Sequence, residues 1–324
     1  MNIIKSKIKG LLEQGKSLKD FIEIYNSFIL FLNAEDGKSR NIWDEISFKF
    51  FYKYLNQYYI EFTIPKKSGE ERKICAPTKQ LKFVQKKIAQ ILQLYYEPNA
   101  FCHGFVQGRS IVSNAEIHTN KNYVLNIDLE DFFPSIKLNR IIEAIEKKPF
   151  NFSPEMAKII AKIACKDGGL PQGSPLSPII SNICCEKLDI DLNTFSVKNK
   201  LRYSRYADDI TFSGYRRIFN NKFFSDLGKI IGGKHRFRIK EAKTRIQTRN
   251  KRQEVTGLVV NDKLNVNRTY VRNLRALIHY YKMGKAEENA QAVIKGKLEF
   301  LKMIKGKDKV YRNLLSQYKR TAHE

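Results

Sequence analysis

The sequence has 324 residues, enough to bury a substantial hydrophobic core and to form two or three structural units. It contains 59 Lys and Arg against 33 Asp and Glu, a formal charge of +26, while 42% of its residues are hydrophobic. This composition excludes a disordered basic tail. It favours a folded protein whose partner is a polyanion, with nucleic acid preferred over a membrane surface.

The five cysteines are an odd number without a C-x-x-C pair, which argues for a reducing compartment and against structural zinc. The N-terminal region has no signal-peptide-like apolar segment, and its longest apolar run, Phe28 to Leu32, is too short to span a bilayer. We therefore expect a cytoplasmic protein that does not associate with membranes.

The first third of the chain predicts helices around a cationic hairpin. Apolar residues from Leu18 to Leu32 recur at helical spacing after Ser17, a residue type that caps helices. Strand-like stretches at 59–64 and 72–76 flank a basic turn, and a helix is expected over 81–96.

Beyond residue 262 helical spacing returns, and the richness in Lys and Arg predicts a basic helical C-terminal domain.

Carboxylates gather in two segments of the middle of the chain. Residues 123–127 form a β-prone run that delivers Asp128 at the end of a strand, although an aspartate there is more often a turn residue. Asp208 and Asp209 lie between two β-prone runs, which predicts a hairpin with both residues at its turn. If Asp128 faces this turn, the three carboxylates could hold two Mg²⁺ ions roughly 3.5–4 Å apart, an arrangement that serves phosphoryl transfer.

A third segment, residues 168–178, is dense in glycine and proline and leads into an apolar helix. Ser177 is expected to cap this helix, with Pro178 at its first helical position. Taken alone, the segment is interpreted as the loop that precedes a helix. Its glycines would also let the backbone approach a nucleotide, and Gln172 could then contact the sugar or the triphosphate.

The segment from Gly10 to Ser17 matches the pattern G-x-x-x-x-G-K-[ST] of phosphate-binding loops. Such a loop must follow a buried strand, yet Ile4, Ile8 and Leu11 recur at helical spacing across its start. We therefore interpret the match as coincidence.

Together and in this order, the three segments resemble the motifs of the reverse transcriptase family. Asp128 matches the first catalytic aspartate, residues 170–175 match the L-P-Q-G-S-P loop beside the incoming nucleotide, and residues 206–209 match the Y-x-D-D signature. The resemblance implies an α+β fold of the right-hand polymerase type, with fingers, a palm with an antiparallel sheet, and a helical thumb. Its catalytic and metal-binding residues would be Asp128, Asp208 and Asp209.

The resemblance also implies domain boundaries and nucleotide-binding residues. The predicted domains are an N-terminal helical region (1–50), fingers (51–122, with part of 137–170), palm (123–261) and thumb (262–324). The basic residues of the fingers hairpin would clamp the triphosphate, and the nucleotide loop would contact the incoming nucleotide. These residues are Arg72 as first choice, Lys66 and Lys67, together with Gln172 and Gly173 of the loop.

Sugar selection is assigned in the same way. Phe133 occupies the place of the bulky residue that excludes a ribose 2′-OH, with Phe132 as a competitor and a core role as the alternative. Lys243-Thr244 resembles a later palm motif in which a lysine lies near the triphosphate.

Two shorter motifs resemble the retron branch of bacterial reverse transcriptases. Residues 114–118 fit the retron N-A-x-x-H pattern and residues 255–257 fit V-T-G, so nucleic-acid binding is expected at Asn114, His118, Val255, Thr256 and Gly257. For His118 a structural role is the alternative. The branch implies an RNA-directed DNA polymerase that uses two Mg²⁺ ions and dNTPs, pairs with a structured non-coding RNA as template and primer, makes an RNA–DNA product, and serves antiphage defence with an effector protein.

Two alternatives remain open. A group II intron-like or other non-retron reverse transcriptase would share the palm motifs, although the DNA-binding and endonuclease extensions of a mobile-intron protein are missing. A non-catalytic RNA-binding protein on a polymerase scaffold is disfavoured, since three like carboxylates without metal carry an electrostatic cost.

Overall fold

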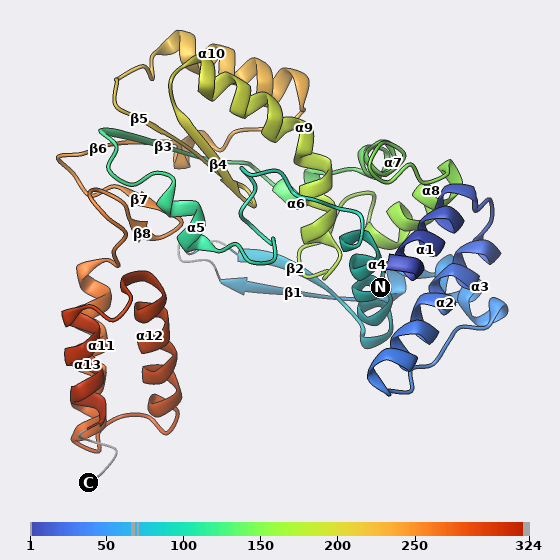
Figure 1. Ribbon diagram of the computed structural model, residues 1–324, viewed down its shortest axis with the longest axis horizontal. Helices are drawn as coiled ribbons and strands as arrows, with labels where there is room; N and C mark the ends of the chain where they lie inside the picture. Colours follow the sequence, from blue (N-terminus) through green and yellow to red (C-terminus); the bar gives the residue numbers. More distant parts are fainter. Residues whose placement is uncertain (1, 66–68, 70, 320–324) are drawn as a thin grey trace. The chain divides into compact units, whose positions relative to one another are not determined.

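The computed structural model describes residues 2–65, 69 and 71–319, and the chain divides into two compact units. Unit 1 comprises residues 1–100 and 130–188, and unit 2 comprises residues 101–129 and 189–324. Each unit therefore combines segments that are far apart in the sequence. Figure 1 identifies their helices and strands by label.

Unit 1 is mainly helical. Its helices are α1 (Asn2–Gln14), α2 (Leu18–Asp36), α3 (Glu45–Lys53), η1 (Leu55–Tyr58), α4 (Lys79–Gln93), α6 (Phe132–Ser135), α7 (Leu138–Ile145), α8 (Pro154–Ala164) and the first half of α9 (Ser177–Lys198). Helix α2 begins where predicted, because Ser17 caps it and forms a capping box with Asp20. Gly10 lies inside α1, which confirms that the match to a phosphate-binding loop is coincidental.

Strands β1 (Tyr59–Pro65) and β2 (Glu71–Pro77) form the predicted antiparallel hairpin of unit 1. Lys66 and Lys67, which follow β1 in the sequence, lie outside the described residues, so their predicted contacts with phosphate stay predictions. Arg72 lies near the start of β2 and is exposed, as a residue that binds a charged ligand must be.

The centre of unit 2 is a four-stranded antiparallel sheet in the order β4-β5-β3-β6. Its strands are β3 (Tyr123–Asp128), β4 (Arg202–Tyr206), β5 (Asp209–Gly214) and β6 (Arg245–Thr248). The register pairs Asp128, the last residue of β3, with Asp209, the first residue of β5. The predicted strand and the predicted hairpin are thus both confirmed, and they bring the acidic residues to one end of the sheet.

The two faces of this sheet differ because side chains alternate along each strand. The apolar face includes Phe212, whose ring contacts Phe195 of α9 and Phe223 of α10 (Asn221–Gly228). The opposite face carries polar side chains, among them Asp128, Asn126, Ser204, Asp209 and Thr211. Figure 1 shows α9 and α10 on one side of the sheet and α5 (Ile111–Glu116) on the other. Helices α9 and α10 cover the apolar face and α5 covers part of the polar face, and a pocket at the acidic end of the polar face can receive a charged ligand.

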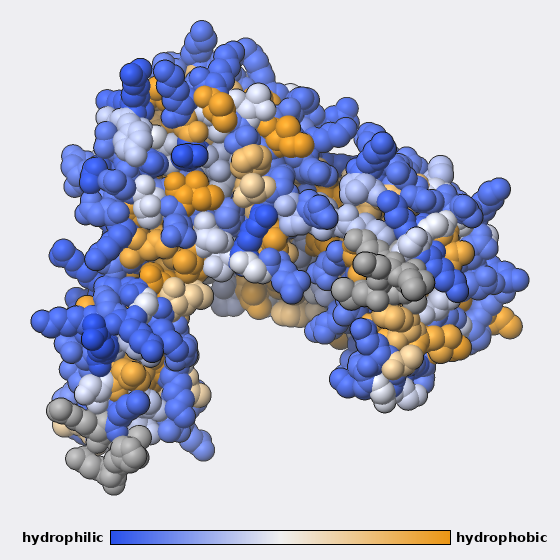
Figure 2. All heavy atoms as spheres, in the orientation of Figure 1, coloured by the Kyte–Doolittle hydropathy of each residue, from blue (hydrophilic) through white to orange (hydrophobic). Residues whose placement is uncertain are grey.

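The remainder of unit 2 is a small hairpin followed by helices. The further elements are η2 (Lys229–Lys234), η3 (Glu241–Lys243), β7 (Glu254–Val255), β8 (Leu258–Val259), α11 (Arg268–Lys282), α12 (Ala290–Lys305) and α13 (Lys309–Lys319). The last three are the helices predicted beyond residue 262. They belong to unit 2, and their core is continuous with Val255 and Leu258 of the hairpin. The face of these helices seen in Figure 2 is mostly hydrophilic. None of the described helices is long and apolar enough to cross a lipid bilayer.

Candidate active site

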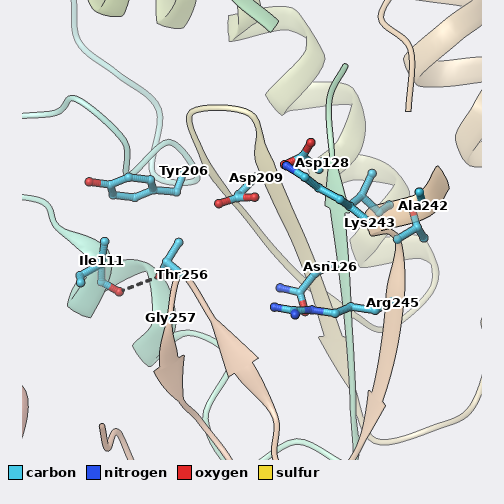
Figure 3. Close-up of a pocket in the computed structure, with 12 residues that line it drawn as sticks. Ile111, Asn126, Asp128, Tyr206, Asp209, Ala242, Lys243, Arg245, Thr256 and Gly257 are labelled. Atoms are coloured by element: carbon cyan, nitrogen blue, oxygen red, sulfur yellow. Dashed lines mark hydrogen bonds and ion pairs between the residues drawn. The ribbon is translucent and has the colours of Figure 1, made fainter. Parts of the chain in front are cut away.

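Three acidic residues meet at one end of the sheet of unit 2. Asp128 ends β3, Asp209 begins β5 directly opposite it, and Asp208 precedes Asp209 in the connecting turn. Directly opposite residues in an antiparallel pair lie roughly 4.5–5.5 Å apart between Cα atoms. The N–H of Leu129 donates to the carbonyl of Asp208 at 3.1 Å, which ties the turn to the end of β3. The prediction that Asp128 faces the turn is confirmed (Figure 3).

The carboxylates at this end repel one another. Asp209 is exposed, yet partial desolvation of its carboxyl group by the protein beside it, and then the charges of Asp208 and Asp128, raise its pKa to about 6. The Lys243 ammonium lies 2.8 Å from Asp128 Oδ2, and this hydrogen bond raises the pKa of Lys243. The site therefore holds an excess of negative charge that a cation would relieve.

The donor set suits a divalent cation that also binds a substrate. Within the described part of the chain, no three carboxylate, imidazole or thiolate side chains converge closely enough to hold a metal ion by themselves. Mg²⁺, however, usually takes one or two carboxylates and completes its shell with water and substrate phosphates. Asp128, Asp208 and Asp209 fit that mode of binding, with a nucleotide as the source of the remaining oxygens.

A pocket of about 560 Å³ opens beside the aspartates on the polar face of the sheet. It is lined by Asp128, Asp209, Tyr206, Asn126, Lys243, Arg245, Thr256 and Gly257, among others. Figure 3 shows Arg245 alongside Asn126, away from the two aspartates. The pocket thus combines an acidic end, suited to a cation, with cationic side chains, suited to phosphate.

The V-T-G segment reaches this pocket from the turn between β7 and β8. Thr256 and Gly257 have φ angles of 46° and 82°, the conformation that a tight two-residue hairpin turn requires. The Thr256 hydroxyl donates to the Ile111 carbonyl at 3.3 Å, so the turn is fixed to α5. Val255, in contrast, is fully buried in the core, where it can only support the turn.

A buried arginine holds the turn that carries Asp208. Ala207 has a φ of 56°, which costs a non-glycine residue of the order of 1 kcal/mol and persists only where its surroundings impose it. Arg205 Nη1 donates to the Ala207 carbonyl at 3.1 Å, and the Arg205 guanidinium also donates to both carboxylate oxygens of Asp189 at 2.7 Å. On the other side, a Cβ on Gly104 would lie 2.5 Å from the Ala207 nitrogen. The turn that carries Asp208 is therefore held between the Arg205–Asp189 pair and the Gly104 backbone.

Arg205 and Asp189 were not predicted from the sequence. The available signal was strand alternation, which places Arg205 on the same face as Tyr203, the apolar face, where a charge needs a buried partner. That partner lies on α9, and it also accepts a hydrogen bond of 2.7 Å from the Tyr203 hydroxyl. Strand alternation could have shown the need for a counter-charge but not its position.

Asn114 and His118, predicted to bind nucleic acid, are fully buried. His118 Nδ1 and Nε2 lie 2.7 Å from the hydroxyls of Ser213 and Ser204, and the Ser204 hydroxyl donates to Asn114 Oδ1 at 2.7 Å. The Ser204 hydroxyl gives its single proton to Asn114, so it accepts a hydrogen bond from Nε2–H of His118. In the neutral imidazole Nδ1 is then the acceptor, and it accepts from the Ser213 hydroxyl. Burial leaves these side chains no surface for RNA, and they brace α5 against β4 and β5 instead.

This network predicts a specific pH dependence of stability. Burial, and then the nearby His103 and Lys121, lower the pKa of His118 to about 3 from an ordinary value of 6.5. The unfolded chain therefore binds one more proton than the folded chain between these values, so stability is lost as pH falls below about 6.5. We expect His118→Gln to remove roughly 1.4 kcal/mol per pH unit from the slope of unfolding free energy between pH 6 and 4. Urea titrations across this pH range measure the slope. His279→Gln, on an exposed part of α11, is the control. Equal slopes in His118→Gln and the wild type would contradict the assignment of this pH dependence to His118.

Unit 1 carries the residues predicted for the deoxynucleotide. Phe132 is buried, whereas Phe133 beside it at the start of α6 keeps part of its ring accessible, which makes Phe133 the better placed of the two to meet a ligand. The Cys75 N–H on β2 donates to the Gln172 carbonyl at 2.8 Å. Gly173 has a φ of 121°, and a Cβ there would lie 3.0 Å from the Cys75 oxygen. The predicted nucleotide loop is thus fastened to the hairpin that carries Arg72, and it needs glycine at 173.

A buried glutamine orders the other end of this loop. Gln85 of α4 is fully buried; its amide donates to the Tyr59 hydroxyl at 2.8 Å, and its oxygen accepts from the Ser174 hydroxyl at 2.8 Å. Helix α9 begins at Ser177, whose hydroxyl donates to the Pro171 carbonyl at 2.8 Å, so Ser177 closes the loop instead of capping the helix as predicted. The loop conformation is set by these contacts.

We expect Gln85→Leu to weaken deoxynucleotide binding more than RNA binding. The change leaves the Ser174 and Tyr59 hydroxyls without their glutamine partner, at a cost of about 1–3 kcal/mol each if they stay buried. Steady-state primer extension should show a KM for dNTP raised roughly ten-fold with a smaller change in kcat, while RNA affinity measured by filter binding stays constant. Gln90→Leu, on the exposed side of the same helix, is the matched control. An unchanged KM would show that Gln85 does not position the loop.

Comparison with known proteins decides the family. The model of a family described as "Reverse transcriptase (RNA-dependent DNA polymerase)" matches residues 64–262, more than half of the chain. The chain belongs to the reverse transcriptase family. This reverse transcriptase is 32% identical over 256 residues to the retron Ec86 reverse transcriptase of Escherichia coli, with 76% of each chain covered. It is 33% identical over 279 residues to the retron Mx162 reverse transcriptase of Myxococcus xanthus, covering 76% of this chain and 58% of that one.

The retron resemblance is thereby confirmed, and the activity class of the reverse transcriptase is RNA-directed DNA polymerase. A structure of apo telomerase from Candida tropicalis superimposes with a TM-score of 0.50 at 12% sequence identity, covering 86% of this chain and 64% of that chain. This likeness in fold, with the antiparallel sheet of unit 2, confirms the right-hand polymerase fold. The similarity to retron reverse transcriptases therefore disfavours both alternatives, a non-retron enzyme and a non-catalytic scaffold.

Proposed function

We propose that this reverse transcriptase copies a structured non-coding RNA into DNA, using Asp128, Asp208 and Asp209 to hold two Mg²⁺ ions. The observation that carries the proposal is the pairing of Asp128 with Asp209 at the end of the sheet, where the neighbouring aspartates contribute to the raised pKa of Asp209. A site with this excess of negative charge is suited to bind cations together with phosphate oxygens.

The roles of the protein groups follow from their chemistry. When bound, the two ions would neutralise the triphosphate and favour ionisation of the primer hydroxyl. Asp128, Asp208 and Asp209 would hold them, while Lys243, which contacts Asp128, and the clamp by Arg205 fix the carboxylates in place before substrate arrives. Arg72, Lys66 and Lys67 would bind the triphosphate, and Gln172 and Gly173 would contact the nucleotide.

Primer extension by the purified protein tests this function. On an RNA template with a DNA primer, we expect synthesis that needs Mg²⁺ and dNTPs, stops on addition of EDTA, and resumes when Mg²⁺ is restored. A DNA template of the same sequence is the control for template class, and pretreatment of the RNA with ribonuclease is the control for contamination. Synthesis that persists in excess EDTA would exclude the metal role of the aspartates.

Phe133 is proposed to exclude ribonucleotides by steric contact with the 2′-OH. Removal of its ring in Phe133→Ala should therefore raise incorporation of rNTPs relative to dNTPs by roughly 10- to 100-fold, since a lost steric clash is worth a few kcal/mol. Competition between the two nucleotides in single-nucleotide extension measures the ratio. Phe132→Ala is the matched control, because Phe132 is a neighbouring phenylalanine in the core. Unchanged sugar selectivity in Phe133→Ala would remove Phe133 from this role.

We further propose that Thr256 and Gly257, which line the pocket, contact the nucleic acid, with Val255, Asn114 and His118 supporting them from the core. The retron type of the enzyme is the basis for four further proposals. They are an RNA partner, a branched or otherwise joined RNA–DNA product, an effector protein, and a role in antiphage defence in the bacterial cytoplasm. Sequencing of nucleic acid that copurifies from the native host tests them together. An RNA covalently joined to DNA is the expected finding, and recovery of random RNA alone would count against it.

A further inference from the structure

The end of the palm sheet opposite the catalytic turn carries a cluster of cations. All four strands contribute, since Lys121 precedes β3, Arg202 begins β4, Arg216 and Arg217 follow β5, and Arg249 follows β6. The segments 119–123, 200–202, 214–218 and 248–252 contain no acidic residue. In Figure 1 this is the end at which the arrow of β3 begins. We call the surface formed by Lys121, Arg202, Tyr215, Arg216, Arg217 and Arg249 the distal patch.

Direct contacts join Lys121, Tyr215 and Arg249 of the distal patch. The Lys121 ammonium lies 4.4 Å from the centre of the Tyr215 ring and donates to the Tyr215 hydroxyl at 2.8 Å. The Asn122 side chain donates to the Tyr215 carbonyl at 3.0 Å, and the Asn122 carbonyl accepts from the Arg249 N–H at 2.9 Å. Lys121, and to a smaller extent Arg202 and Arg249, lower the pKa of Tyr215. These groups therefore share one electrostatic environment on a fixed frame.

The chemistry of the distal patch matches single-stranded or irregular RNA. Tyr215 is 57% exposed, and Arg202, Arg216 and Arg217 are exposed as well. Arg249 pairs with Asp262 at 2.8 Å, but a solvent-exposed pair of this kind holds a cation only weakly. Cations track the phosphates, while an exposed aromatic ring gives an unpaired base a surface on which to stack.

The position of the distal patch fixes which part of an RNA it can bind. Six residues of β5 separate it from the catalytic turn, a span of roughly 17–20 Å at about 3.3 Å per residue. That is about twice the distance over which charges act through physiological salt, so the patch does not steer groups at the aspartates directly. A ligand that uses both regions must be a long polyanion.

We propose that the distal patch binds a second segment of the partner RNA, one that is not being copied, while another segment occupies the active site. The identity of the polyanion as the template RNA rests on the proposed function. The patch would hold the RNA body by its phosphates and by stacking of an unpaired base on Tyr215. Its contribution is to the affinity for structured RNA, not to nucleotide chemistry.

The test uses the full chain with Arg202→Glu, Arg216→Glu and Arg217→Glu combined. The first probe is a synthetic RNA hairpin of several tens of nucleotides with a single-stranded tail, and the second is oligo(dT) extended on poly(rA). We expect the Kd for the hairpin to rise at least ten-fold and the slope of log Kd against log salt to fall by about two to three, as for the loss of that many phosphate contacts. Extension on poly(rA) at saturating template should stay within about two-fold of the wild type.

The matched control carries the same change of charge on unit 1, as Lys19→Glu, Lys86→Glu and Lys158→Glu, all exposed lysines. A milder pair, Arg216→Gln with Arg217→Gln, covers the case in which the triple variant fails to fold, and should raise the hairpin Kd about three-fold. Unchanged hairpin affinity, equal loss in the control, or loss of extension on poly(rA) by a folded variant would each overturn the proposal. If the wild type extends no primer, the proposed function fails, while the hairpin comparison still decides whether the patch binds RNA.

Discussion

We expect Asp208→Asn to reduce DNA synthesis by at least about 10³-fold while RNA affinity stays within roughly two-fold of the wild type. The amide is nearly isosteric with the carboxylate, and the Asp208 carbonyl that accepts from Leu129 is unchanged, so the turn should keep its shape. What is lost is one negative charge of three at the proposed metal site, and charge neutralisation is the main contribution of such sites to phosphoryl transfer. Single-turnover extension at saturating dNTP, with filter binding of the RNA, separates the two effects.

The control for this variant is Asp262→Asn, which removes a carboxylate from an exposed pair with Arg249. It should leave synthesis nearly unchanged, because such pairs contribute little. Synthesis by Asp208→Asn within ten-fold of the wild type would show that Asp208 holds no metal ion needed for the reaction.

Arg205→Met is expected to cost roughly 3–5 kcal/mol of unfolding free energy, since it leaves the buried Asp189 carboxylate without its cation. It also removes the donor to the Ala207 carbonyl, so the turn that carries Asp208 should lose its fixed position. We expect a loss of kcat beyond what the unfolded fraction explains. Urea unfolding gives the first quantity, and extension normalised to folded protein gives the second.

A compensated variant separates stability from positioning. Arg205→Met combined with Asp189→Leu and Tyr203→Phe removes the charge and its hydrogen-bond partners together, and replacement of a buried pair by apolar residues is often neutral or stabilising. This variant should regain most of the lost stability but not the lost kcat. Full recovery of kcat with stability would mean that Arg205 serves the fold alone and does not position the catalytic turn.

Several features of this reverse transcriptase were predictable because their causes are local. The cap at Ser17, the strand that ends at Asp128 and the hairpin around Asp208 each depend on residue types and spacing within a few positions. The order of the three motifs along the chain then identified the family. Local patterns also excluded the phosphate-binding loop, since Gly10 lies within a run of helical periodicity.

Only the tertiary structure decided which residues meet. Strand pairing set Asp128 opposite Asp209, and the short helix η3 set Lys243 against Asp128, although these residues are far apart in the sequence. Packing likewise buried His118 against the polar face of two strands, where its short motif had suggested a surface role. Burial and counter-charges are properties of several segments packed together, whereas sequence periodicity reports on one segment at a time. The sequence by itself therefore determined the family and the acidic residues of the site, and the fold determined how those residues are paired, charged and held.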